Sequence, residues 1–105
     1  MIKNFQPKKG EPITFTITFS ESANFSSIEL AGKKSYGDKN YAFYVSLGNG
    51  ITKISDTTYQ VMIPTNTLSY ETYLYDLRVM LNSVPYIPMS GRVNVKPSVF
   101  EVYNG

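Results

Sequence analysis

The stretch that decides the fold is YLYDLRVMLNSVPYIPMSGRVNV, residues 73–95. In its first nine residues, large apolar side chains hold alternate positions: Tyr73, Tyr75, Leu77, Val79 and Leu81. Asp76 and Arg78 fall between them, which is the period-2 pattern of a strand with one buried face. Asn82 and Ser83 interrupt the pattern as a two-residue turn does. The stretch therefore predicts the closing meander of a small β-sandwich.

The same alternation recurs upstream, most clearly in residues 13–19. Four large apolar residues on one face alternate with three threonines on the other: Ile13, Phe15, Ile17 and Phe19 against Thr14, Thr16 and Thr18. Further strands are predicted at residues 27–31, 41–47, 51–54, 58–63, 73–81, 84–89 and 92–95. Gly48-Asn49-Gly50 is expected to close a hairpin, residues 32–40 to form a loop, and the crossing at 65–72 has room for one helical turn. About seven short strands separated by turn signals predict an all-β, immunoglobulin-like antiparallel sandwich.

Proline placement indicates which strands lie at a sheet edge. Pro85 and Pro88 both follow the turn at Asn82, and proline is tolerated where no backbone donor is needed, so this segment is predicted to be a protected edge. Residues 13–19 contain neither proline nor charge. As an edge strand they would be an open template for another chain, which makes their threonines candidate interface residues.

Composition bounds the domain and its chemistry. A chain of 105 residues, 42% hydrophobic and 17% charged, fits one globular domain over residues 1–105, with 1–11 and 97–105 as candidate extended arms. It has no cysteine and no histidine, which excludes disulfides, thiolate chemistry, serine-histidine catalysis and the usual zinc ligands. Its eight acidic residues are scattered, mostly in turns, whereas paired-carboxylate catalysis needs two converging groups. We therefore expect no enzyme activity, small-molecule substrate, cofactor or metal.

Charge and hydropathy give expectations about other partners. A net charge of +2 does not imply nucleic-acid binding, and Lys8-Lys9 and Lys33-Lys34 are expected to be solvated loop charges. The aromatic residues alternate into the predicted core, which argues against an oligonucleotide-binding barrel. No D-x-D-x-D-G run indicates calcium binding. The first twelve residues have no apolar run suited to a signal peptide or a membrane span.

Nine tyrosines are many for this length. Four share the alternating apolar faces and are predicted to lie in the core or at its rim: Tyr41, Tyr59, Tyr73 and Tyr75. The other five are candidates for an exposed contact surface: Tyr36, Tyr44, Tyr70, Tyr86 and Tyr103. Tyr73 occupies the place of a tyrosine corner, whose hydroxyl ties down the preceding loop, with Tyr75 as the alternative.

Two interpretations of the surface remain open. Tyr44, Tyr86 and Arg78 join the three threonines as candidate interface residues, and Asp76 and Arg78 are expected to form a surface ion pair or an interface contact. Exposed tyrosines also suit carbohydrate binding, although tryptophan is absent. Exposed tyrosines lining a groove would favour sugar, whereas a flat apolar patch continuous with an open strand edge would favour protein assembly.

Three segments together carry a family resemblance: GEPITFTITFS near the start, the Gly-Asn-Gly turn, and TLSYETYLYDLRVMLNSVPYIPMSGRVNVKPSVFEV at the end. This pattern resembles small tailed-bacteriophage virion proteins with an immunoglobulin-like sandwich, including the amino-terminal domains of upper baseplate proteins. The matching positions are Leu68, Tyr73, Tyr75, Asp76, Gly91, Val93 and Val95. The loop at residues 69–72 departs from the family pattern, which usually has a glycine-containing turn there.

The resemblance implies a non-catalytic structural component of a phage particle, in the tail, baseplate or neck, or as a decoration of the capsid. Its implied partners are other virion proteins and further copies of itself, and its implied location is the virion, assembled in the host cytoplasm. The alternative is a carbohydrate-binding module that uses exposed tyrosines.

Overall fold

The computed structural model describes residues 1–20 and 25–99. It contains seven strands: β1 (Ile13–Thr18), β2 (Ser27–Lys33), β3 (Phe43–Leu47), β4 (Gly50–Lys53), β5 (Thr58–Ile63), β6 (Thr72–Leu81) and β7 (Val84–Asn94). Within these ranges, no helix is long and apolar enough to cross a membrane. Tyr103 and residues 100–105 of the predicted second arm lie outside the described part of the chain.

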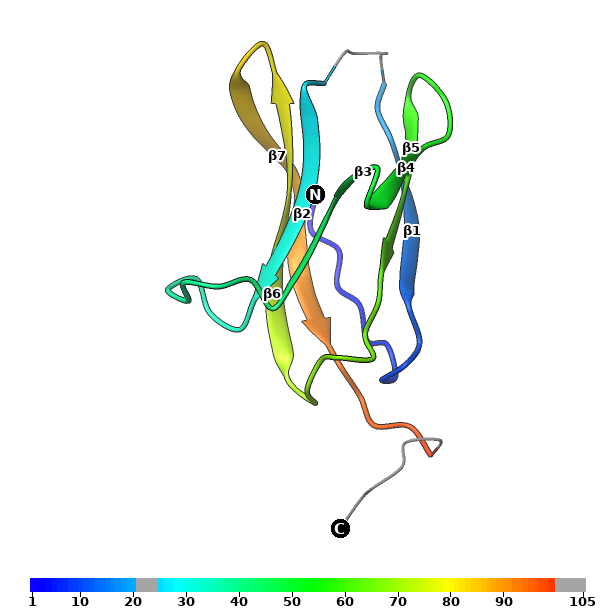
Figure 1. The fold of residues 1–105 in the computed structure, drawn as a ribbon, viewed down its shortest axis with the longest axis vertical. Helices are drawn as coiled ribbons and strands as arrows, with labels where there is room; N and C mark the ends of the chain where they lie inside the picture. Colours follow the sequence, from blue (N-terminus) through cyan, green and yellow to red (C-terminus); the bar gives the residue numbers. More distant parts are fainter. Residues whose placement is uncertain (21–24, 100–105) are drawn as a thin grey trace.

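The strands form one hydrogen-bonded sheet that folds over into two layers. The order is β1-β5-β4-β3-β2-β6-β7, and Figure 1 shows β1, β4 and β5 on one side with β2, β6 and β7 on the other. Inward-facing side chains from every strand fill the space between the layers. The alternating faces predicted these side chains because successive strand residues point to opposite sides. The predicted all-β, immunoglobulin-like sandwich of seven strands is confirmed.

The predicted hairpin at Gly48-Asn49-Gly50 is wrong. β3 and β4 are paired in the parallel sense, Ser46 opposite Gly50 and Leu47 opposite Ile51, while the other strand neighbours are antiparallel. Gly48 and Gly50 have φ of 88° and 99°, values that favour glycine. Ser46 and Asn49 exchange backbone hydrogen bonds across the turn. The chain therefore winds through a tight loop and continues in the same direction, which carries it into the other layer.

Strand ends differ from the prediction by one residue in β1, β4 and β6, and by more in β2, β3 and β7. The two predicted final strands are one strand, β7, and β2 extends two residues further, to Lys33. β3 begins at Phe43, so the alternation does not reach Tyr41, which is 54% exposed instead of buried. Leu47 is also exposed, because it lies at the turn into β4.

The crossing between β5 and β6 contains no helical turn. Its local backbone hydrogen bonds run from the Leu68 amide to the Thr65 carbonyl and from the Glu71 amide to the Ser69 carbonyl, and each closes only a short turn. Thr65 is 1% exposed, and its hydroxyl donates to the Glu11 carbonyl at 2.9 Å and accepts from the Gly10 amide at 3.0 Å. This buried threonine joins the crossing to the turn before β1.

The predicted tyrosine corner is confirmed at Tyr73. Its buried hydroxyl accepts from the Ser69 amide at 2.9 Å and donates to the Ser69 carbonyl at 3.3 Å. The hydroxyl of Tyr75, the alternative, instead donates to the Lys3 carbonyl at 2.6 Å. Tyr73 thus holds the loop that leads into β6.

Tyr73→Phe is expected to lower the free energy of unfolding by about 1–2 kcal/mol, because the Ser69 amide and carbonyl lose their buried partner. Urea unfolding of both proteins measures the difference. Tyr86→Phe is the matched control, since Tyr86 is half exposed on β7. An unchanged unfolding midpoint for Tyr73→Phe would contradict a stabilising corner.

The first nine residues run along β7. Isolated parallel bridges join Ile2 to Ser90, Phe5 to Val93 and Lys8 to Lys96. The Phe5 ring stacks on Phe15 of β1 at 5.2 Å between centroids, which brings the two ends of the folded sheet together. Residues 1–9, which we call the amino-terminal arm, therefore cover the second half of β7. Within the described residues, the segment with Pro85 and Pro88 that was predicted to be the edge meets the arm only where the Met1 ammonium donates to the Pro88 carbonyl.

Burial beneath the amino-terminal arm raises the pKa of one side chain, the Tyr75 hydroxyl. Tyr75, under the arm, has its pKa raised to about 12, chiefly by burial and then by the neighbouring Asp76 carboxylate. The hydroxyl therefore keeps its proton to a higher pH than an ordinary tyrosine, and it donates a hydrogen bond to the Lys3 carbonyl.

Candidate functional site

β1 lies at the end of the sheet and is paired only with β5 among the described strands. The Phe19 amide bonds to the Thr57 carbonyl, which continues the ladder and shows that the odd-numbered residues bond toward β5. The even-numbered residues, Thr14, Thr16 and Thr18, therefore direct their amides and carbonyls away from the sheet. No backbone hydrogen bond joins these three residues to another described residue on the outer side.

The open edge of β1, meaning the outward backbone groups of Thr14, Thr16 and Thr18, is short. Pro12 precedes it at an even position and has no amide hydrogen to offer. The threonine side chains are exposed, and the Thr18 hydroxyl lies 3.2 Å from that of Thr58 on β5. The three predicted threonines thus form one surface suited to accepting a short strand.

A second surface lies on the outer face of β3, β2 and β6. The register places Tyr44, Ala31 and Asp76 in one row across the three strands. The adjoining row holds Glu29 and Arg78 directly opposite each other. Because Ala31 is the smallest side chain in its row, the sheet is hollowed there. The result is a groove of about 210 Å³.

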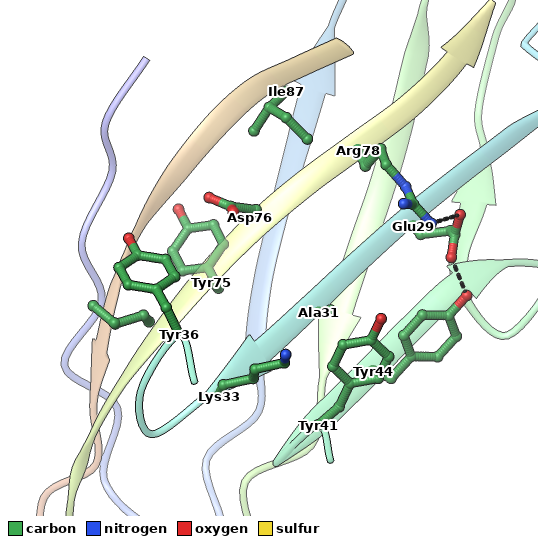
Figure 2. Close-up of a pocket in the computed structure, with 11 residues that line it drawn as sticks. Glu29, Ala31, Lys33, Tyr36, Tyr41, Tyr44, Tyr75, Asp76, Arg78 and Ile87 are labelled. Carbon is green, nitrogen blue, oxygen red and sulfur yellow. Dashed lines mark hydrogen bonds and ion pairs between the residues drawn. The ribbon is translucent and has the colours of Figure 1, made fainter. Parts of the chain in front are cut away.

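Exposed tyrosines wall this groove. Tyr36, from the loop after β2, is 75% exposed, and Tyr41 precedes β3. Figure 2 shows Tyr36 on one side of Lys33 and the Tyr41 and Tyr44 rings on the other. These two rings are stacked, 5.5 Å between centroids and 13° apart in plane, and the Lys33 ammonium lies 5.4 Å from the Tyr41 centroid.

Glu29 is the hydrogen-bonding centre of the groove wall. The Tyr44 hydroxyl donates to Glu29 at 2.5 Å, and Arg78 Nη2 donates to the other carboxylate oxygen at 2.9 Å. The bond from Tyr44, followed by that from Arg78, lowers the pKa of Glu29, and the pKa of Tyr44 is raised in return. Arg78 therefore forms an ion pair with Glu29, and not the surface ion pair with Asp76 that the sequence suggested, because a residue directly opposite is nearer than one two positions along the same strand.

The six predicted interface residues fall in three places. The threonines share the edge of β1, while Tyr44 and Arg78 meet at Glu29 on the groove wall. Tyr86, 51% exposed on β7, does not line the groove. The other predicted assignments of tyrosines hold for Tyr36, Tyr44, Tyr70 and Tyr86, which are exposed, and for Tyr59, Tyr73 and Tyr75, which are buried.

Sequence reasoning missed the floor of the groove. Alternation in β2 already turns Glu29, Ala31 and Lys33 outward, and a small residue between two charged ones is a signal for a hollow. The register that brings Asp76 and Tyr44 beside Ala31 was not predicted. Lys33 was assigned to a loop, but it ends β2 and approaches Tyr41, while Lys34 forms an ion pair with Glu71 at 2.9 Å.

Comparison with known proteins supports the fold. No protein-family model matches the sequence, and no curated protein matches it. Among solved structures, the chain is similar to the extracellular domain of the voltage-gated sodium channel β4 subunit, described as a parallel homodimer with a role in cell-cell adhesion. The identity is 13%, the match covers 93% of each chain, and the TM-score is 0.51. At this identity the likeness shows the immunoglobulin-like fold alone.

Proposed function

We propose that this chain is a non-catalytic assembly module that associates with protein partners by strand addition at the open edge of β1. The observation that carries the proposal is the outward, unpaired backbone of Thr14, Thr16 and Thr18 within the described structure. An added strand would satisfy these groups and extend the layer. The other end of the sheet is partly covered by the amino-terminal arm, so β1 is the better place for pairing.

A second copy of the chain fits this edge by symmetry. In an antiparallel pair of β1 strands, the outward residues pair as Thr16 with Thr16 and Thr14 with Thr18. This register uses all of the outward groups of the three threonines. The paired threonines would form a ladder on the exposed face. The homodimer described for the sodium channel β4 domain is a precedent for self-association of an immunoglobulin-like domain.

The setting we propose is a bacteriophage virion, with the tail or baseplate favoured over the capsid surface. Support comes from the sequence resemblance to small virion proteins and from a fold that is stable without any cysteine or histidine. The partners are then neighbouring virion proteins and further copies of the chain. Strand pairing at this edge suits such an assembly because it fixes the register between two subunits.

Thr16→Cys is expected to give a disulfide-linked dimer under mild oxidation, because opposite hydrogen-bonded residues have Cα atoms about 5.5 Å apart, within the range that a disulfide spans. The chain has no other cysteine. Thr14→Cys is the matched control: it faces Thr18 in this register, so it should give little linked dimer. Non-reducing electrophoresis reads the outcome.

Thr16→Pro supplies the converse test. Its amide points outward, so proline should leave the fold intact while removing a donor from the interface. Light scattering should show less dimer than for the unaltered chain, with an unchanged circular dichroism spectrum. A chain that stays monomeric at all concentrations, does not crosslink through Thr16→Cys and captures no virion protein would refute the proposal.

A further inference from the structure

We propose that the groove on the outer face of β3, β2 and β6 is a binding site for a neutral sugar unit of a glycan. This surface is separate from the edge of β1, so the inference stands independently of the assembly proposal. The groove meets the condition stated above for sugar binding, because exposed tyrosines line a hollow in the surface.

The size of the groove suits a small unit. Its volume of about 210 Å³ lies below the roughly 300–1,000 Å³ of pockets that hold drug-sized ligands. Tyr36 and Tyr41 are more than half exposed and stand on either side of Lys33. Aromatic rings supply apolar contact at low cost in conformational entropy, which suits the C–H face of a pyranose ring.

The charges of the groove favour a neutral ligand. Two carboxylates, Glu29 and Asp76, and two cations, Lys33 and Arg78, line it, so the formal charges cancel. An anionic or a cationic ligand would gain from one pair and be repelled by the other. A sugar hydroxyl can donate a hydrogen bond to a carboxylate and accept one from a cationic side chain, so a neutral sugar can bind both kinds of charged group in the groove.

Asp76 is the group best placed to bind hydroxyls. Glu29 is already engaged by Tyr44 and Arg78. Within the described residues, the carboxylate of Asp76 has no hydrogen bond or ion pair, and it lies beside Ala31 at the floor. Figure 2 shows Asp76 and Tyr36 bordering the same part of the groove. A carboxylate can accept hydrogen bonds from two neighbouring hydroxyls.

The test is an amide-resolved NMR titration of the whole chain with three neutral probes: maltohexaose, cellohexaose and chitohexaose. At least one should shift the amides of Ala31, Lys33 and Asp76. For that probe, Tyr41→Ala and Asp76→Asn should each weaken binding about tenfold. Tyr86→Ala removes a tyrosine of similar exposure outside the groove and should leave the affinity within about twofold.

Two further probes separate other occupants of the groove. Sialyllactose tests for an anionic sugar, and a hexa-arginine peptide tests for a cationic protein segment. The proposal is overturned if no neutral probe shifts the groove amides, if only sialyllactose or the peptide does, or if Tyr41→Ala and Asp76→Asn bind the neutral probe as well as the unaltered chain does. Unchanged amide shifts away from the groove verify that the variants are folded.

Discussion

Gly91→Ala is expected to lower the free energy of unfolding by about 3 kcal/mol and to lift the amino-terminal arm from β7. A Cβ atom at Gly91 would overlap the backbone carbonyl of Lys3, which cannot rotate away as a side chain can. That carbonyl is also the acceptor for the buried Tyr75 hydroxyl. Moving it would leave the hydroxyl without its partner and separate Phe5 from Phe15.

Urea unfolding measures the loss of stability, and hydrogen exchange of the Phe5 and Asn94 amides reports on the arm, since both form hydrogen bonds across it. Gly37→Ala is the matched control: a Cβ there meets nothing within 4 Å, so the change should stay within about 0.5 kcal/mol. Tyr75→Phe should cost little in the Gly91→Ala background, because both substitutions act on the Lys3 carbonyl. A Gly91→Ala protein as stable as the unaltered chain would contradict this account.

Most of the fold prediction came from the alternation of apolar and polar residues along the strands. It placed β5 at its observed bounds and separated the buried Ile13, Phe15 and Ile17 from the exposed threonines. The hairpin turn between β6 and β7 was also predicted, and Asn82 and Ser83 both have positive φ, as a type I′ turn requires. These features are local, so a short window of residues determines them.

Most of the errors concern contacts between segments that are distant in the sequence, and one concerns the point at which a strand begins. The arm pairs with β7 almost ninety residues later in the chain, and nothing near Ile2 specifies Ser90 as its partner. The path from β3 to β4 depends on the two layers that the loop joins, rather than on glycine content alone. Tyr41 was placed in the core because alternation was extended two residues beyond the strand. The groove needed the register of three strands, which alternation does not supply.

The two candidate surfaces differ in how much of each could be predicted. The edge of β1 follows from one strand, since an uncharged, proline-free run can be recognised without knowing its neighbours. The groove exists only because Ala31 lies between Tyr44 and Asp76, residues from two other strands. Its geometry therefore depends on how β3 is held against β2, and one inward-facing position at the end of β2 controls this.

Gly32→Ala is expected to lower the free energy of unfolding by about 2–3 kcal/mol and to disturb the groove from the inside. The Phe43 ring packs over Gly32, its partner in register, and a Cβ there would overlap the ring. Phe43 is buried, and its ring packs edge-on against the Tyr73 ring with 5.9 Å between the ring centroids. The Phe43 ring therefore has little space to move. The strain should therefore displace β3, which also carries Tyr44.

Two measurements distinguish this effect from simple destabilisation. Urea unfolding gives the free-energy change, with Gly37→Ala again as the control. The ring and amide signals of Tyr44 report on β3, and its bond to Glu29 should weaken in Gly32→Ala. Tyr73→Phe loses stability at the other side of the same aromatic contact but keeps both rings, so its Tyr44 signals should not change. If Gly32→Ala lost stability while the Tyr44 signals stayed unchanged, the prediction that this substitution displaces β3 would be wrong.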